Sequence, residues 1–239
     1  MASNALKTVI VPPVGGGFPS ATVFLLHGLG DTASGWTDVA RMLGQNQSLQ
    51  HVRFVLPTAP VQPVTINMGM SMTSWFDIYS LTDIEQDEDK VGLLKSTESV
   101  RSLVQKEIDG SAEGLNGHGV PSERIVVAGF SQGGAIALLL GLTTTWSLAG
   151  VAGLSTWLPL RKQILELRAN PKPFPIFEAH GTADQIVNFA FGKATYEGLR
   201  DQLHFGDQIE FHEYAGMMHS ACPQEIQDLK QWLEKVIPI

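Results

Sequence analysis

The chain has 239 residues, of which 44% are hydrophobic and 17% charged, so it can bury a large core and is unlike a disordered protein. Its 24 acidic and 16 basic residues give a formal net charge of −8, which argues against nucleic-acid binding and against polybasic attachment to anionic lipid. The single cysteine excludes an internal disulfide and any multi-cysteine metal site. We expect one domain over residues 1–239, with residues 1–7 as a flexible N-terminal tail.

The N-terminal segment matches neither a signal peptide nor a lipidation signal. Position 2 is Ala, so the glycine that myristoylation requires is absent. The longest apolar stretch, Gly134–Leu142, is about half as long as the roughly 20 residues of a membrane-spanning helix. We therefore expect a cytoplasmic protein.

Short apolar runs alternate along the chain with longer amphipathic runs, as is typical of βαβ units around a parallel sheet. The expected strands are, in chain order, Thr8–Val11, Thr22–His27, Val52–Leu56, Arg124–Phe130, Ala149–Leu154, Pro175–His180 and Gln208–Tyr214. The expected helices are Ser34–Leu43, Leu93–Ile108, Gly133–Leu142, Arg161–Arg168, Phe189–Leu203 and Pro223–Val236. The acidic segment Asp83–Lys90 is expected to be a solvated loop or a lead-in to a helix. The pattern predicts an α/β fold with a mostly parallel central sheet and helices on both faces.

The strongest chemical signal is the sequence Gly-Phe-Ser-Gln-Gly at residues 129–133, between an apolar strand and a helix-like run. In this setting the pattern is typical of a nucleophile elbow, a sharp turn that exposes a serine hydroxyl. A Cβ at either glycine would collide with neighbouring backbone, and the helix N-terminus favours developing negative charge. The pattern predicts Ser131 as a nucleophile; the alternative is a serine that caps a glycine-rich helix start.

A nucleophilic serine needs a histidine base, which in turn needs an orienting acid. In elbow-bearing enzymes these partners follow in the order serine, acid, histidine. Asp184 lies on the loop beyond the strand that ends at His180, and His219 lies between the last strand and the last helix. We predict Asp184 as the acid and His219 as the base, with Asp201 and Asp207 as alternative acids. His180 is expected to be a structural histidine.

Acyl transfer also needs two N–H donors for the oxyanion of the tetrahedral intermediate. One predicted donor is the backbone N–H of Gln132, the residue after the serine. The other is the N–H of Leu29, which Gly28 and Gly30 allow the loop to present. The glycine-rich segments lack phosphate-binding spacing, and no metal-ligand motif is present, so we expect no cofactor and no metal.

Methionine and aromatic residues lie close in sequence to the predicted site. Met68, Met70 and Met72 alternate, so an extended segment would put all three on one face. Unbranched, polarizable methionine suits a groove for a flexible acyl chain, whereas plain core filling is the alternative. The predicted substrate-binding residues are Met68, Met70, Met72, Trp75, Phe76, Trp157 and Leu158.

Six segments in this order resemble the acyl-protein thioesterase/lysophospholipase family of small α/β-hydrolases. They are His27–Asp31, Trp75–Asp77, Gly129–Gly134, Ser155–Pro159, His180–Asp184 and Gly216–His219. The resemblance implies a single-domain α/β-hydrolase fold, a triad of Ser131, Asp184 and His219, and oxyanion donors at Leu29 and Gln132.

The activity implied by this resemblance is that of a serine hydrolase. Its substrates would be S-palmitoyl thioesters on protein cysteines, together with related carboxylic esters or lysophospholipids. The implied partner is an S-acylated protein or a lysolipid, and transient contact with a membrane surface is left open. Two alternatives remain: a short-acyl carboxylesterase or deacetylase with the same triad, and a non-catalytic ligand receptor with the same fold.

Overall fold

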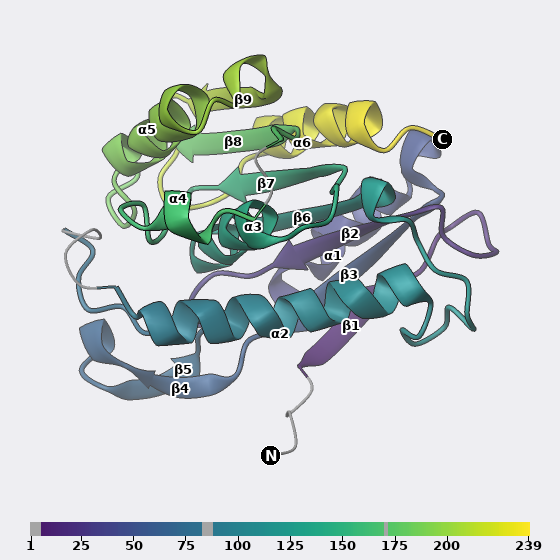
Figure 1. The fold of residues 1–239 in the computed structure, drawn as a ribbon, viewed down its shortest axis with the longest axis horizontal. Coiled ribbons are helices and arrows are strands. Elements are labelled where there is room, and N and C mark those ends of the chain that lie inside the picture. Colours follow the sequence, from purple (N-terminus) through teal and green to yellow (C-terminus); the bar gives the residue numbers. More distant parts are fainter. Residues whose placement is uncertain (1–5, 83–87, 170–171) are drawn as a thin grey trace.

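The computed structural model describes residues 6–82, 88–169 and 172–239, and these build one domain around a seven-stranded sheet (Figure 1). The strand order is β1-β3-β2-β6-β7-β8-β9, in which β1 runs antiparallel to β3 and the other neighbours are parallel. The sheet strands are β1 (Lys7–Val11), β2 (Ala21–Leu26), β3 (Val52–Thr58), β6 (Ile125–Phe130), β7 (Gly150–Leu154), β8 (Ile176–Gly181) and β9 (Ile209–Tyr214). All seven predicted strands are confirmed, to within two residues at each end.

Two strands were not predicted. They are β4 (Val61–Val64) and β5 (Met70–Thr73), which form a separate antiparallel hairpin beside the main sheet. At the other end of the sequence, residues 1–5 of the predicted tail lie outside the described residues. β1 already begins at Lys7, the last residue assigned to that tail.

The helices are α1 (Ala33–Gly44), α2 (Lys90–Asp109), α3 (Gln132–Thr143), α4 (Ile164–Leu167), α5 (Phe189–Glu197) and α6 (Pro223–Val236). The prediction for α6 is confirmed at both ends. The helix α4 is shorter than predicted, because residues 161–163 form a turn and the backbone becomes extended at Arg168. The predicted end of α5 is instead a π-helical turn, Gly198–Gln202, in which the Leu203 N–H donates to the Gly198 carbonyl. None of the described helices is both long and apolar enough to cross a membrane.

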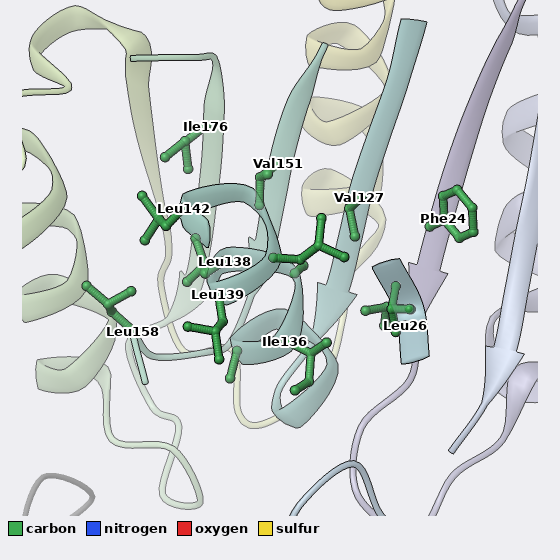
Figure 2. Close-up of a cluster of buried hydrophobic side chains, with 14 of the residues drawn as sticks. Phe24, Leu26, Val127, Ile136, Leu138, Leu139, Leu142, Val151, Leu158 and Ile176 are labelled. Atoms are coloured by element: carbon green, nitrogen blue, oxygen red, sulfur yellow. The ribbon is translucent and has the colours of Figure 1, made fainter. Parts of the chain in front are cut away.

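Alternating residues of the strands pack into two core layers, one on each face of the sheet. In β2, Phe24 and Leu26 pack on one face with residues of α2 and α3, and Val23 and Leu25 pack on the other with residues of α1 and α6. This confirms the prediction of helices on both faces (Figure 1). The position of α3 explains its composition, since it lies between the sheet and α2 and is buried from Gln132 to Leu142. Figure 2 shows its leucine side chains in the same cluster as apolar residues of β6, β7 and β8.

The predicted acidic loop lies mostly outside the described residues, since residues 83–87 are not described. Its last two acidic residues, Glu88 and Asp89, are described and lead into α2, which begins at Lys90. The Glu88 carboxylate accepts a hydrogen bond from the Leu160 N–H, and the Asp89 carboxylate accepts one from the Gly92 N–H and so caps α2.

Candidate active site

The turn between β6 and α3 has the geometry of a nucleophile elbow. Ser131 has φ 53° and ψ −120°, a conformation that a non-glycine residue seldom adopts and that marks local strain. A Cβ on Gly129 would lie 2.2 Å from the Gly133 carbonyl carbon, and a Cβ on Gly133 would lie 2.3 Å from the Leu26 oxygen. The two glycines are therefore required by close backbone contacts, as the sequence pattern predicts.

Three side chains from three segments meet at this turn. The Ser131 Oγ lies 3.0 Å from His219 Nε2, and His219 Nδ1 lies 2.7 Å from Asp184 Oδ2. The serine follows β6, the aspartate follows β8, and the histidine lies on the loop between β9 and α6. All three residues predicted from motif order are thus joined in one hydrogen-bonded series at the carboxyl edge of the parallel strands.

The Asp184 carboxylate is held on both oxygens. Its Oδ1 accepts hydrogen bonds of 2.9 Å from the backbone N–H groups of both Ile186 and Val187, while its Oδ2 faces both His219 and His180. Burial alone raises the pKa of this carboxyl, but the hydrogen bonds from the two histidines and from Ile186 outweigh it and hold the pKa well below its ordinary value. Asp184 is therefore ionised at neutral pH and able to orient the imidazole of His219.

The other predicted polar residues take different places. His180 is buried, and its Nε2 lies 2.8 Å from the Val187 carbonyl, as expected for a structural histidine, although it also lies 3.4 Å from Asp184 Oδ2. The alternative acid Asp201 pairs with Arg200 at the surface. Neither Asp201 nor Asp207 is among the hydrogen-bond partners of His219 in the described part of the chain.

Two backbone N–H groups beside the serine are unpaired. Within the described residues, neither the Leu29 N–H nor the Gln132 N–H has a hydrogen-bond acceptor. The loop that carries Leu29 approaches the serine closely, because a Cβ on Gly28 would lie 3.4 Å from the Ser131 Cβ. Two free donors near one hydroxyl form the arrangement that stabilises an oxyanion.

An apolar cavity of about 210 Å³ opens at this point. Its walls are formed by Gly28, Leu29, Asp31, Ile78, Leu81, Phe130, Ser131, Trp157, Ile186, Val187 and His219. Most of these side chains are hydrocarbon, and Ser131 and His219 are among the few polar groups that they surround. A cavity of this kind is suited to an apolar substrate group next to the reacting atoms.

Of the predicted substrate-binding residues, Trp157 is in the cavity wall. The hairpin methionines are placed differently: Met68 is 96% exposed and Met70 is 60% exposed, and neither is in the wall. Met68 lies in the turn between β4 and β5 with a left-handed φ of 56°, outside the alternation of the strand. Met72 is half-buried, and its sulfur lies 3.9 Å from the position of a Cβ on Gly30, which belongs to the loop of Gly28, Leu29 and Gly30, here called the oxyanion loop.

The remaining three predicted residues, Trp75, Phe76 and Leu158, are buried. The ring of Phe76 packs edge-on against Trp157, with centroids 6.0 Å apart, and so supports the cavity wall from behind. Trp75 is fully buried beneath the oxyanion loop.

The sequence did not single out four aliphatic residues of the cavity wall. They are Ile78, Leu81, Ile186 and Val187. Ile186 and Val187 lie two and three residues after Asp184, the predicted acid. Their closeness to Asp184 in sequence could have identified them as residues of the site. Ile78 and Leu81 follow β5 and are distant in sequence from Ser131, Asp184 and His219. No sequence pattern therefore indicated that they line the cavity.

The described residues contain no group of three or more His, Cys, Asp or Glu side chains arranged to hold a metal ion. Cys222, the single cysteine, is the N-cap of α6, where its Sγ accepts a hydrogen bond from the Glu225 N–H at 3.5 Å.

Comparison with known sequences now decides the family. A sequence model of the Phospholipase/Carboxylesterase family matches residues 13–237. The chain belongs to this family. It is 56% identical over 237 residues to acyl-protein thioesterase 1 of Mycosarcoma maydis, covering 98% of this chain and 99% of that protein. It is 44% identical over 231 residues to acyl-protein thioesterase 1 of Cryptococcus neoformans, covering 91% and 93%.

Solved structures agree with this membership of the carboxylesterase family. The crystal structure of Zea mays acyl-protein thioesterase 2 matches with a TM-score of 0.79 and 26% identity, over 97% of this chain and 99% of that chain. The crystal structure of Arabidopsis thaliana SOBER1 matches with a TM-score of 0.78 and 28% identity, over 91% and 99%. The predicted resemblance to acyl-protein thioesterases and the predicted α/β-hydrolase fold are confirmed, and the protein is a hydrolase of carboxylic esters or thioesters.

Proposed function

We propose that this carboxylesterase-family hydrolase cleaves S-palmitoyl thioesters on protein cysteines, and related esters or lysophospholipids, through an acyl-enzyme on Ser131. The observation that carries the proposal is the hydrogen-bonded series from Asp184 through His219 to Ser131 in the wall of an apolar cavity. Similarity over almost the whole chain to two fungal acyl-protein thioesterases supports this substrate class.

The first half-reaction forms the acyl-enzyme. The Ser131 Oγ attacks the thioester carbonyl carbon while His219 Nε2 takes its proton, and Asp184 stabilises the imidazolium that results. The carbonyl oxygen becomes an oxyanion that accepts hydrogen bonds from the N–H groups of Leu29 and Gln132. Collapse of this intermediate breaks the carbon–sulfur bond, and the cysteine thiol leaves with the proton from His219.

The second half-reaction restores the enzyme. A water molecule takes the place of the thiol and gives a proton to His219 Nε2 as it attacks the acyl carbon. The same two N–H groups stabilise the second oxyanion. The carbon–oxygen bond to Ser131 then breaks, the serine regains its proton from the imidazole, and the fatty acid is released.

The cavity provides the affinity for the acyl group. Each methylene that leaves water for an apolar wall contributes about 0.8 kcal/mol, so the aliphatic wall favours longer chains. The apolar residues of this wall include Leu81, Ile78, Trp157, Ile186 and Val187. We propose a cytoplasmic location for this reaction, because a single cysteine is typical of a protein that works in a reducing compartment.

The test is a chain-length series of acyl thioesters on a model peptide, from acetyl to palmitoyl, with purified protein and the Ser131→Ala variant. We expect palmitoyl turnover to exceed acetyl turnover, and the variant to lose roughly 10⁵–10⁶-fold in kcat. A variant that kept a tenth of the wild-type rate would contradict the role of Ser131. Higher acetyl turnover would favour a short-acyl esterase, and absence of both turnover and fluorophosphonate labelling would favour a ligand receptor.

A further inference from the structure

We infer that His27 is a positioning residue of the oxyanion hole: its imidazole sets the orientation of the Gly28–Leu29 peptide group and thereby aims the Leu29 N–H. The inference rests on the proposed hydrolysis at Ser131 and deepens it, because it explains what holds one of the two oxyanion donors. His27 makes no contact with the reacting atoms itself, since it is fully buried behind the loop.

The contacts of His27 determine which of its ring nitrogens carries the proton. The backbone N–H of Ala59 donates to His27 Nε2 at 3.0 Å, so this nitrogen is the acceptor. The proton of the neutral ring is then on Nδ1, which lies 2.7 Å from the Gly28 carbonyl oxygen and donates to it. Burial lowers the pKa of His27, although the Gly28 carbonyl opposes this effect, so the ring is neutral at neutral pH.

The bond to the Gly28 oxygen has a direct effect on Leu29. The Gly28 carbonyl and the Leu29 N–H belong to one peptide group, and in a trans peptide the C=O and N–H point in opposite directions. The described chain contains no cis peptide. Because His27 holds the oxygen on its own side of the loop, the Leu29 N–H must point to the other side. The Asp31 N–H also donates to the Gly28 oxygen, at 3.3 Å, and so favours the same orientation of the Gly28–Leu29 peptide group.

The side to which the Leu29 N–H points is the side of the nucleophile. Leu29 and Ser131 both belong to the cavity wall, and Gly28 passes so close to Ser131 that an added Cβ would lie 3.4 Å from the serine Cβ. The N–H has no acceptor within the described residues, so it is available to a ligand that supplies one. The oxyanion of the intermediate is such an acceptor.

A second contact links the two oxyanion donors. The Trp75 indole Nε1–H donates to the His27 carbonyl at 2.8 Å, and the Trp75 backbone N–H donates to the side-chain Oε1 of Gln132 at 3.0 Å. Trp75 therefore ties the loop of Leu29 to the residue that supplies the other donor. His27 fixes the peptide that this link leaves free to rotate, the one between Gly28 and Leu29.

Two variants separate the two hydrogen bonds of the ring. In His27→Asn the side-chain NH₂ takes the place of Nδ1 and donates to the Gly28 oxygen, but the acceptor for the Ala59 N–H is lost. In His27→Gln the amide oxygen reaches the place of Nε2 and accepts from Ala59, but the donor to Gly28 is lost. Each variant removes one buried hydrogen bond, so both are expected to lower the melting temperature by similar amounts.

The inference predicts that the two variants differ in catalysis. Removal of a whole oxyanion donor costs about 10²–10³-fold in kcat, so a donor that is present but poorly aimed should cost roughly 10–100-fold. We expect this loss in His27→Gln, with KM little changed because the contact forms in the transition state, and a much smaller loss in His27→Asn. Equal losses of kcat in the two variants at equal stability would overturn the inference.

A second readout reports on the oxyanion directly. A trifluoromethyl ketone adds to the serine hydroxyl to form a hemiketal, whose oxygen occupies the position of the oxyanion. The pH at which this hemiketal ionises, followed by ¹⁹F NMR, should rise in His27→Gln and stay near the wild-type value in His27→Asn. An unchanged value in His27→Gln would contradict the aiming of Leu29 by His27.

Failure of the inference and failure of the proposed function give different results. If Ser131→Ala still hydrolyses thioesters and no hemiketal forms on the wild-type protein, the proposed function fails. If Ser131→Ala is inactive and the wild-type hemiketal forms, but the two His27 variants behave alike, then only the role of His27 is wrong.

Discussion

Both oxygens of the Asp184 carboxylate have hydrogen-bond or ionic partners. Its two oxygens face two histidines and two backbone N–H groups, and their combined effect keeps it ionised although burial opposes ionisation. The consequence is a fixed tautomer of His219: Nδ1 carries the proton that the carboxylate accepts, so Nε2 is free to take the proton of Ser131.

Asp184→Asn tests this tautomer control. An amide at this position can donate to Nδ1 and so favours the wrong tautomer, and kcat for thioester hydrolysis should fall by about 10⁴-fold. Asp207→Asn is the matched control on the alternative acid and should change kcat by less than about twofold. The reverse ranking of the two variants would move the acid to residue 207.

Glu225 lies in the first turn of α6 and is fully buried. Within the described residues, neither of its carboxylate oxygens has a hydrogen-bond partner at normal geometry. Burial raises its pKa to about 7, with the Cys222 backbone N–H opposing part of the effect. The folded protein therefore binds this proton more tightly than the unfolded chain does. Stability from this residue is fully present below the unfolded pKa and is lost as the pH rises toward 7.

Glu225→Gln should remove this pH dependence. The pKa of the carboxyl rises from its ordinary value of 4.5 to about 7 in the folded protein, and this difference corresponds to about 3 kcal/mol, so the wild type should lose up to that amount between pH 5 and pH 8. The variant, which has no proton to lose, should lose less over the same range. Urea unfolding at the two pH values measures both, and identical pH slopes would contradict the raised pKa.

At the scale of elements, the cavity is formed by loops rather than by the β4–β5 hairpin. The exposed Met68 and Met70 of the hairpin are not among the residues of the cavity wall, whereas Leu81 and Ile78 are. The segment after β5 therefore has more influence on the acyl chain than the alternation of Met68, Met70 and Met72 suggests.

Leu81→Asp should reduce the preference for long chains. A carboxylate in the cavity wall removes apolar surface from each methylene that would pass it, at about 0.8 kcal/mol each, so palmitoyl turnover should fall at least tenfold more than acetyl turnover. Met70→Asp, on the exposed hairpin, is the control and should leave the ratio unchanged. If instead Met70→Asp changes the ratio and Leu81→Asp does not, the methionine face lines the groove. Circular dichroism of both variants verifies that they fold.

The elements that the sequence predicted well are those with one dominant signal. Strands buried on both faces, such as Ile125–Phe130, are continuously apolar, and α6 begins at a proline that suits the first turn of a helix. The hairpin was missed because its strands have only four residues each and are largely exposed, so neither contains the apolar run that marks the strands of the main sheet. The order of motifs brought out Ser131, Asp184 and His219, whereas the aliphatic cavity wall depends on how separate loops meet, which no local pattern encodes.

At the scale of the whole molecule, α3 joins the site to the core. Its first residue follows Ser131, and the helix is buried from Gln132 to Leu142 and contacts both the sheet and α2. Figure 2 shows Leu138, Leu139 and Leu142 among the apolar side chains of this core. The elbow is thus anchored to a helix that is buried in the core, and loosening of that packing should affect both stability and the position of Ser131.

Leu139→Ala should destabilise the fold by about 2–5 kcal/mol, because a fully buried leucine leaves a cavity that its neighbours fill only in part. Val91→Ala, which is on α2 and 79% exposed, is the surface control and should change stability by less than about 0.5 kcal/mol. Chemical denaturation of the two variants measures the difference. Similar stabilities would show that α3 does not lie in a tightly packed core.

The hydrogen bond between Ser131 and His219 spans 88 residues of sequence, and the one between His219 and Asp184 spans 35. The oxyanion loop reaches the nucleophile through the pairing of Leu26 with Gly129, another distant contact. Loops of this length close late in folding, after helices have formed locally. During refolding, ester hydrolysis should therefore recover more slowly than the circular dichroism signal of the helices. The recovery of activity would then measure how fast the most distant strand pairings form.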